Sequence, residues 1–417
     1  MLIKRDVQVL VSGAGPVGLV TALLLNRRGV RVAVVDEQMR TVARSYACAI
    51  HPRTLELLDE LGVASELVAQ GQRVDKFAYY EGRDRRLELD YGKLSGRFPF
   101  LLIVPQPMLE DALERRLNSE GVEVKWCHRL AHVDASGPQA KVLLHQLEHG
   151  TIGYSVLRTA WTVVREDQLE VPFVVGADGH RSVVRRQLGI DCPAAGESQL
   201  FAVWEFSGEG PEMKEARVSL SAGGLANVCW PLGRGWYRFG FEIDPAESPD
   251  ARPEKSRQIA IAGDTSHEYL DRSRLPKLIA ERAPWFEVAA RDVAWSMAIR
   301  FERRLAASYG KGPAWILGDA AHVAPPVSVQ SMNLGLQEAR TLAVELEAVL
   351  RTGASRDRLA AWATARRTDF EAVLTRPPTA GPDAQGFARQ WAKAIGDSVP
   401  VSGDDRAKLL SQAGLQA

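Results

Sequence analysis

The hydrophobic pattern near the start of the chain changes period twice within thirty residues. Residues 8–11 form a short apolar run, residues 16–28 have helical spacing, and residues 30–35 are rich in valine. A short apolar run fits a buried strand, whereas a longer periodic segment fits a helix. The pattern therefore predicts a strand, a helix and a second strand, which together form a parallel βαβ unit.

Similar signals recur further along the chain. Amphipathic spacing predicts helices at residues 53–61 and 108–119, and short apolar runs predict strands at 122–126 and 173–175. A buried strand at 315–317 and long helices at about 333–350 and 356–374 follow later. Strands that alternate with helices are typical of an α/β domain with a parallel sheet.

The pattern differs between residues 199 and 303. Four strand-like segments there are joined by turns that contain glycine or proline: 200–206, 217–221, 227–230 and 236–243. We therefore expect an antiparallel sheet inserted into the α/β domain. The expected division is 1–198 for the α/β domain with part of that sheet, 199–303 for the inserted sheet, 304–375 for the return to the α/β domain, and 376–417 for a Pro/Gly-rich linker and one or two short helices.

Composition narrows the functional classes. Of 417 residues, 46% are hydrophobic, and 52 Lys and Arg balance 52 Asp and Glu. A balanced charge favours neither nucleic acid nor an anionic membrane as a partner. The four cysteines are far apart, so we expect no disulfide framework, no metal site and a cytoplasmic location; they are Cys48, Cys127, Cys192 and Cys229.

The apolar run from residue 9 to residue 25 follows Lys4 and Arg5, which is the arrangement of a signal peptide. Glycines and a proline interrupt this run and suit a strand, a turn and a helix better. We therefore expect neither a targeting segment nor a membrane partner.

The interrupting residues have the spacing Gly13-x-Gly15-x-x-Gly18. In such a loop the first glycine permits the turn, the second lets the backbone approach a pyrophosphate, and the third lets helix and strand pack closely. Pro16 and Val17 open the helix, whose N-terminal amides face the anion. The loop predicts a dinucleotide site but leaves NAD, NADP and FAD open.

An acidic residue completes this unit at the end of the second strand. Asp36 lies 23 residues after Gly13, where a carboxylate can accept a hydrogen bond from the adenosine ribose. Glu37 is the alternative at the next position.

Two later segments decide between the dinucleotides. Residues 174–185 contain Asp178-Gly179, and residues 318–326 read Gly-Asp-Ala-Ala-His-Val-Ala-Pro-Pro. Both resemble motifs of the single-component FAD-dependent aromatic hydroxylases, the para-hydroxybenzoate hydroxylase type (group A flavoprotein monooxygenases). Residues 105–110 and 51–58 match two further segments of that family, and the matches keep family order over about residues 6–370.

The resemblance implies a fold and an activity. The fold would be an FAD-binding Rossmann-like domain of the glutathione-reductase type with a substrate-binding sheet and C-terminal helices. NAD(P)H would reduce the flavin, O₂ would add at C4a, and the hydroperoxide would oxygenate an aromatic or polyketide-like molecule, such as one of secondary metabolism. The sequence contains no second GxGxxG loop, which fits transient binding of NAD(P)H.

The resemblance also implies roles for single residues. Asp319 would bind the ribityl chain, Asp178 would lie near the pyrophosphate, and Gln106 would contact the flavin. Pro325 and Pro326 would border flavin C4a, and no catalytic base is assigned. The predicted cofactor-binding residues are Gly13, Gly15, Pro16, Val17, Gly18, Asp36, Glu37, Arg44, Arg53, Gln106, Asp178, Gly179, Gly318, Asp319, Pro326, Ser331, Met332 and Asn333.

One segment departs from the family pattern. After the prolines the family has a glycine-rich turn whose amides contact the flavin, whereas this chain reads Val-Ser-Val-Gln-Ser-Met-Asn at 327–333. Val329 is the least suitable substitute, because a β-branched residue resists positive φ. A shifted flavin, weaker flavin retention and loss of redox chemistry are the three possible consequences.

Several interpretations therefore stay open. An FAD oxidase or dehydrogenase and a flavin-poor, non-catalytic paralogue share the fold, whereas a halogenase is disfavoured because no Trp-x-Trp occurs. His322 is interpreted as structural rather than as a base. Four aromatic residues of the inserted sheet fit the core better than a substrate pocket; they are Trp204, Trp230, Tyr237 and Phe239. The oligomeric state is not predicted.

Overall fold

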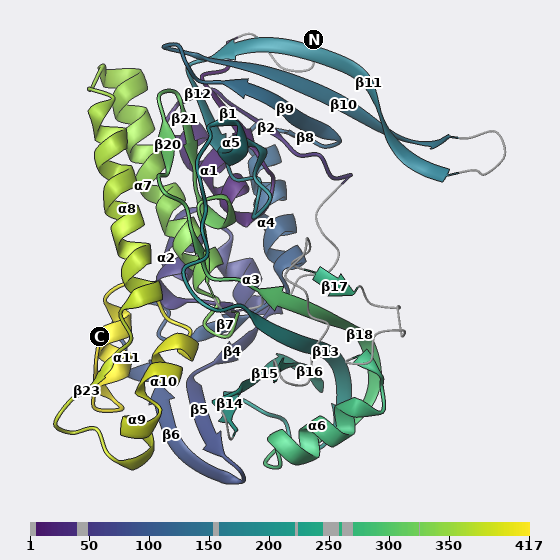
Figure 1. Ribbon diagram of the computed structural model, residues 1–417, viewed down its shortest axis with the longest axis vertical. Helices are drawn as coiled ribbons and strands as arrows, with labels where there is room; N and C mark the ends of the chain where they lie inside the picture. The colour runs from purple at the N-terminus through teal and green to yellow at the C-terminus, as the bar shows by residue number, and fades with distance from the viewer. Residues whose placement is uncertain are drawn as a thin grey trace.

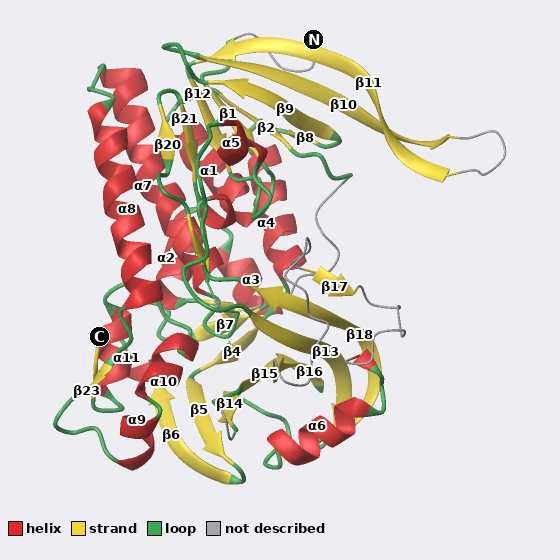
Figure 2. Ribbon diagram, viewed as in Figure 1, coloured by secondary structure: helices red, strands yellow, loops and turns green. Residues whose placement is uncertain are grey.

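The computed structural model describes residues 6–39, 49–152, 158–221, 224–244, 258–260, 270–324 and 326–417. Figures 1 and 2 show a parallel sheet in the upper half and a second large sheet in the lower half. The long helices α7 (Gln330–Thr352) and α8 (Asp357–Thr375) run along one side of the upper half. The predicted two-part α/β architecture is confirmed.

The upper sheet has six strands. Their order is β20 (Gly310–Lys311), β21 (Ala314–Ile316), β12 (Phe173–Gly176), β1 (Val9–Ser12), β2 (Val32–Val35) and β8 (Val124–Lys125). All neighbours are parallel except β20 and β21. Helix α1 (Pro16–Arg27) packs against α7 and against α4 (Gln106–Ser119). Because β1, β12 and β21 are parallel neighbours, the segments that follow them meet at one edge of the sheet.

The lower sheet has eight strands. Their order is β17 (Gln258–Ala260), β18 (Ala289–Phe301), β13 (Gln199–Glu209), β16 (Trp236–Ile243), β15 (Ala226–Gly233), β14 (Ala216–Leu220), β5 (Lys76–Glu81) and β6 (Asp84–Asp90). Neighbours are antiparallel except β14 and β5. The sheet thus combines the segment after residue 199 with two strands from the first 100 residues.

The pleat of the lower sheet separates its aromatic residues. Trp204, Tyr237 and Phe239 pack in one buried cluster with α6 (Arg274–Arg282), so their interpretation as core is confirmed. Trp230 belongs to the opposite face, which packs against the C-terminal segment and residues 327–332. Alternation along each strand therefore gives the sheet one closed face and one face toward the upper half.

Smaller elements surround the two sheets. A three-stranded sheet of β9 (His128–Asp134), β10 (Ala140–Ile152) and β11 (Arg158–Val171) was not predicted, because most described side chains of β11 are exposed. The others are β3 (Ala49–Ile50), β4 (Gln72–Val74), β7 (Leu101–Ile103), β19 (Arg304–Leu305), β22 (His322–Val323), α2 (Pro52–Glu60), α3 (Ala64–Gln70) and α5 (Val183–Gln187).

The C-terminal segment packs closely on the lower sheet. It contains three short helices rather than one or two: α9 (Gly386–Gln390), α10 (Ala392–Ser398) and α11 (Asp405–Ser411). Strands β23 (Thr379–Ala380) and β24 (Leu415–Gln416) pair across the segment. The Tyr79 hydroxyl donates to the carbonyl of Ile395 at 3.3 Å, and the Tyr91 hydroxyl donates to that of Pro400 at 2.8 Å.

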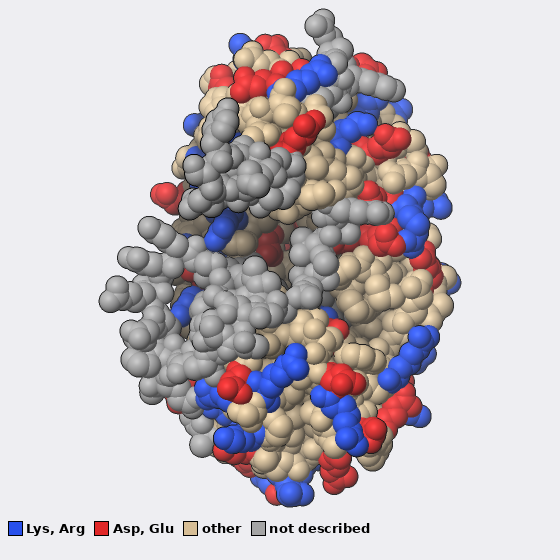
Figure 3. Space-filling view, turned by 90° about the vertical axis from the view of Figure 1, so that its right-hand side faces the viewer, with Lys and Arg blue, Asp and Glu red and all other residues tan. Residues whose placement is uncertain are grey.

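The described surface mixes charges of both signs. Figure 3 shows Lys and Arg side chains interspersed with Asp and Glu over one face of the molecule. Among the helices of the described ranges, none has both the length and the apolar character needed to cross a membrane.

Candidate active site

The first glycine loop joins β1 to α1 and has no room for larger residues at two positions. Gly13 has φ +104°, and a Cβ there would lie 2.2 Å from the carbonyl oxygen of Ala177. A Cβ on Gly18 would lie 1.9 Å from the carbonyl oxygen of Gly13. Gly15 differs, because a Cβ there would meet nothing within 4 Å. The open space therefore lies at the second glycine, where a pyrophosphate is expected.

Asp36 follows β2 and turns its carboxylate toward this loop. Its Oδ2 accepts the N–H of Ala14 at 2.7 Å, and its Oδ1 accepts the N–H of Gln38 at 2.8 Å. Asp36 is half-buried, whereas Glu37 is exposed. The structure therefore favours Asp36 over Glu37 as the acid that binds the ribose.

Asp178 follows β12 at the same edge of the sheet. Its Oδ2 accepts the amides of Val183 at 2.7 Å and Val184 at 3.1 Å, at the start of α5. Its Oδ1 is buried without a hydrogen-bond partner among the described residues. Burial raises the pKa of this carboxyl, although the amides and Ser182 lower it. A buried, unpaired acceptor near the loop suits a donor from a bound cofactor.

The third motif packs directly on the start of α1. Gly318 has φ +60°, and a Cβ there would lie 3.1 Å from the side chain of Val17. A Cβ on Gly335 of α7 would lie 2.9 Å from both Gly318 and Val17. This close approach places the half-buried Asp319 beside the N-terminus of α1. Motifs that are more than a hundred residues apart thus meet at one edge.

His322 lies in the interior and stabilises this turn. Its ring is fully buried, its Nε2 lies 2.7 Å from Oε1 of Glu338, and it stacks on Phe370 at a centroid distance of 3.7 Å. Oε2 of Glu338 accepts the N–H of Gly318 at 3.1 Å. These contacts support the structural interpretation of His322.

Val329 adopts the backbone conformation that a glycine would take. It precedes α7 with φ +49° and ψ +34°, in the left-handed region. That conformation costs an L-residue about 1–2 kcal/mol, and a β-branched residue is especially unsuited to it. The loop therefore keeps a glycine-like shape although valine replaces glycine. The valine side chain is 5% exposed and packs among the residues of the lower sheet and C-terminal segment.

Two buried side chains fix the backbone on either side of Val329. Nε2 of His51 donates to the carbonyl of Ser328 at 3.0 Å. Nδ2 of Asn333 donates to the carbonyls of Val329 at 2.9 Å and Ala49 at 3.0 Å, and its Oδ1 accepts the N–H of His51 at 2.9 Å. Each such bond contributes about 1 kcal/mol, so together they can offset the strain at Val329.

The buried ring of His51 is neutral and donates through Nε2. Burial lowers its pKa from 6.5 to about 3, although the bond to Ser328 raises it. The carbonyl of Ser328 can only accept, so the proton of the neutral ring is on Nε2.

The remaining loop side chains also turn toward protein. Oγ of Ser331 accepts the N–H of Ala324 at 2.7 Å, and the amide of Gln330 donates to the carbonyl of Val401. Met332 is half-buried between the two largest clusters of buried side chains. Backbone amides are therefore the groups with which this loop would contact a flavin.

The other predicted residues have the following positions. Gln106 begins α4, and its side-chain amide donates to Glu110 at 2.7 Å. Arg53 donates to Asp404 of the C-terminal segment at 2.7 Å, and no hydrogen bond among the described residues joins it to the three motifs. Arg44 and Pro325 lie outside the described residues.

A small cavity separates the lower sheet from this loop. Its lining includes Arg238, the one titratable side chain among the described residues that line it. Nη2 and Nε of Arg238 donate to Oε2 of Glu205 at 2.6 Å and 3.1 Å, and the guanidinium lies 5.1 Å from the ring centre of Trp295. The other lining residues are Phe201, Val203, Val228, Trp230, Gly240, Phe301 and Pro326.

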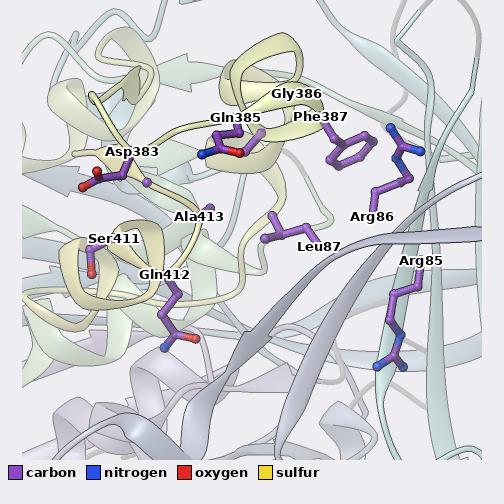
Figure 4. Close-up of a pocket in the computed structure, with 12 residues that line it drawn as sticks. Arg85, Arg86, Leu87, Asp383, Gln385, Gly386, Phe387, Ser411, Gln412 and Ala413 are labelled. Atoms are coloured by element: carbon purple, nitrogen blue, oxygen red, sulfur yellow. The ribbon is translucent and has the colours of Figure 1, made fainter.

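A larger cavity of about 600 Å³ lies between β6 and the C-terminal segment (Figure 4). Strand β6 contributes Leu87 and helix α9 contributes Phe387 to its lining, and Arg85 pairs with Glu88 and Glu215. Its described lining contains no residue of the first loop, of the Asp178 and Asp319 motifs or of the 326–333 loop. This cavity is therefore separate from the candidate cofactor site.

Comparison with known proteins agrees with this geometry. Residues 6–376 match the family described as FAD binding domain. The chain is 32% identical over 362 residues to 6-methylpretetramide 4-monooxygenase of Streptomyces rimosus. The aligned residues cover 86% of this chain and 59% of that protein. It is 27% identical to pentachlorophenol 4-monooxygenase of Sphingobium chlorophenolicum, with 89% and 64% covered. The chain thus spans about three fifths of the length of these two relatives.

A similar fold occurs in solved structures. p-Nitrophenol 4-monooxygenase PnpA from Pseudomonas putida DLL-E4 matches with a TM-score of 0.71 at 22% identity, covering 99% of this chain and 94% of that one. Aklavinone-11 hydroxylase in complex with FAD and aklavinone matches with a TM-score of 0.71 at 23% identity, covering 98% and 73%.

The chain belongs to the FAD binding domain family. This confirms the resemblance carried by the motifs, and it decides that the dinucleotide of the first loop is FAD. The residues present fit that cofactor, because the space at Gly15, the acid Asp36 and the unpaired oxygen of Asp178 lie along one edge of the sheet.

Sequence reasoning missed three contributors to the site. His51 belongs to the matching segment 51–58, but nothing in that segment indicates a bond to a loop almost 300 residues away. Glu338 and Arg238 had no sequence signal, because a single charged residue in a helix or strand usually faces solvent.

Proposed function

We propose that this protein is an FAD-dependent monooxygenase that uses NAD(P)H and O₂ to oxygenate an aromatic or polyketide-like small molecule. The observation that carries the proposal is the cavity between the lower sheet and Pro326. Its apolar, aromatic lining and one fixed charged group have the composition of a small-molecule site, and its volume of about 20 Å³ means that the lining side chains must move for an aromatic ring to enter. The names of the relatives, which include monooxygenases of phenols and polyketides, support the same reaction class.

Bound FAD would supply the redox chemistry, in which NAD(P)H, a proton and O₂ give NAD(P)⁺, water and one oxygen atom on the substrate. The protein's own part is to bind the cofactor and the substrate and to position them relative to each other. The first loop and Asp36 hold the adenosine end, while the 326–333 loop presents amides to the flavin end. Phe201, Trp230 and Phe301 give the cavity apolar walls, which exclude water from the reacting atoms.

The substrate is expected between the lower sheet and the flavin. Arg238 and its partner Glu205 are the polar groups that would orient an oxygen of the ring. We further propose a cytoplasmic location, for which the separated cysteines and the use of NAD(P)H are the support.

The test is an oxygenation assay on the purified protein. It should carry flavin, consume NAD(P)H faster when a phenol or an aromatic polyketide is added, and incorporate one oxygen atom from ¹⁸O₂ into the product. NAD(P)H-independent oxidation of the substrate with release of H₂O₂ would instead identify an oxidase. A protein that binds no flavin under any condition would refute the proposal.

A further inference from the structure

Buried side chains hold the 326–333 loop, the segment in which the family resemblance leads us to expect glycines. His51 and Asn333 come from segments almost 300 residues apart. They are joined by a hydrogen bond from the backbone N–H of His51 to the side-chain Oδ1 of Asn333 at 2.9 Å. Both side chains are fully buried. Their remaining bonds go to the carbonyls of Ser328 and Val329 and, from Asn333, also to that of Ala49.

The anchored carbonyls lie directly around the strained residue. Val329 has φ +49°, a conformation that glycine adopts without cost and valine does not. The bonds to Ser328 and Val329 oppose rotation of the backbone out of this conformation. A glycine at 329 would need no such support.

Packing alone does not explain a histidine at position 51. Its Nδ1 is buried without a hydrogen-bond partner among the described residues, which an apolar side chain of similar size would avoid. What the imidazole adds over an apolar residue is the bond to Ser328.

We propose that His51 and Asn333 are positioning residues that hold the 326–333 loop in its flavin-binding shape, and that they are what permits a valine at position 329. The inference rests on the proposed assignment of this loop to the flavin. It predicts an energetic coupling between residue 51 and residue 329 that a merely structural histidine would not show.

The test is a double-mutant cycle on the full chain. His51→Leu should weaken FAD binding by about 5-fold to 10-fold, which corresponds to the one side-chain bond that it removes, because the backbone N–H of residue 51 is kept. His51→Gln, which retains an N–H donor, should restore most of that affinity. Val329→Gly in the His51→Leu background should return the affinity to within about 3-fold of Val329→Gly alone. The readouts are FAD titration of the stripped protein and the visible spectrum of bound flavin.

His128→Leu is the matched control. His128 is also buried, and its Nδ1 lies 2.6 Å from the carbonyl of Trp126 in the upper half of the molecule. His128→Leu should leave FAD affinity unchanged. A cycle of His128→Leu with Val329→Gly should show no energetic coupling.

Two outcomes would overturn the proposal: unchanged FAD affinity in His51→Leu, or changes of FAD affinity in the two single variants that simply multiply in the double variant. If the protein binds no FAD, the proposed function fails separately. In that case the melting temperatures of the natural chain, the two single variants and the double variant test the inference. If His51 supports the strained conformation of Val329, Val329→Gly should raise the melting temperature more in His51→Leu than in the natural chain.

Discussion

The two ends of the proposed FAD site are built in different ways. At the adenosine end, Gly13 and Gly18 allow the backbone to pack where any side chain would collide with a carbonyl. At the flavin end, the backbone has a similar left-handed turn, but Val329 occupies it and His51, Ser331 and Asn333 fix the surrounding loop. One end relies on missing side chains and the other on hydrogen-bonded ones.

The difference shows which feature of a glycine each end requires. Gly18 is needed for space, and no hydrogen bond can replace space. Position 329 requires a φ value, and a φ value can be imposed by neighbours if their bonds offset a cost of about 1–2 kcal/mol. A glycine-to-valine difference is therefore tolerable at one loop and not at the other.

The largest effect is expected at the first loop. Gly18→Ala should destabilise the protein by about 3 kcal/mol and abolish flavin retention, because its Cβ would overlap the carbonyl oxygen of Gly13. Gly15→Ala should leave the melting temperature of the FAD-free protein unchanged and weaken FAD binding, since its Cβ enters only the open space. Equal melting temperatures for both variants would contradict this division of roles.

The next largest effect is expected on the KM when Arg238, the charged residue of the small cavity beside Pro326, is replaced. Arg238→Met should raise the KM for an oxygen-bearing aromatic substrate about 10-fold to 100-fold, through loss of a charged hydrogen bond, while flavin content is retained. Arg217→Met is the control, because Arg217 lies over the rings of Tyr80 and Trp285 on the opposite side of the same sheet. Steady-state kinetics that show the same KM change in both variants would exclude a specific role for Arg238.

A smaller effect is expected at the ribose. Asp36→Asn should weaken FAD binding about 10-fold, since the ribose and the N–H of Ala14 then face a neutral amide instead of a carboxylate. Glu37→Gln changes an exposed neighbour and should have no effect. Fluorescence titration with FAD measures the affinity of both variants. A larger loss of FAD affinity in Glu37→Gln than in Asp36→Asn would identify Glu37 as the residue that binds the ribose.

The smallest predicted effect is a pH dependence. The folded-state pKa of His51, about 3, is below its ordinary value of 6.5, so its contribution to stability is complete above pH 6.5 and is lost as the pH falls from 6.5 toward 3. This group alone should lower the free energy of unfolding by about 1 kcal/mol between pH 6.5 and pH 5.5. Urea denaturation at pH 6.5 and pH 5.5 measures this change. The decrease in the free energy of unfolding should be smaller for His51→Gln than for the natural chain, by about the same amount.

Much of the fold followed from local patterns. Strand β1, helix α1 and the long helices α7 and α8 begin and end within three residues of the predicted positions. The hairpin of β10 and β11 was missed because the described side chains of β11 are mostly exposed and do not alternate clearly. The three C-terminal helices are five to seven residues long, which is too short for a periodic signal.

For the site, the sequence determined the dinucleotide loop, the acid at the end of the second strand and the order of the FAD motifs, because glycine spacing and strand ends are local properties. Only the tertiary structure decided how Val329 is accommodated. The strain at one residue is compensated by His51, which is 278 positions earlier in the chain and meets the loop only in the tertiary structure. The sequence therefore identified the position at which the flavin end departs from its family, and long-range hydrogen bonds determined that the loop keeps its shape.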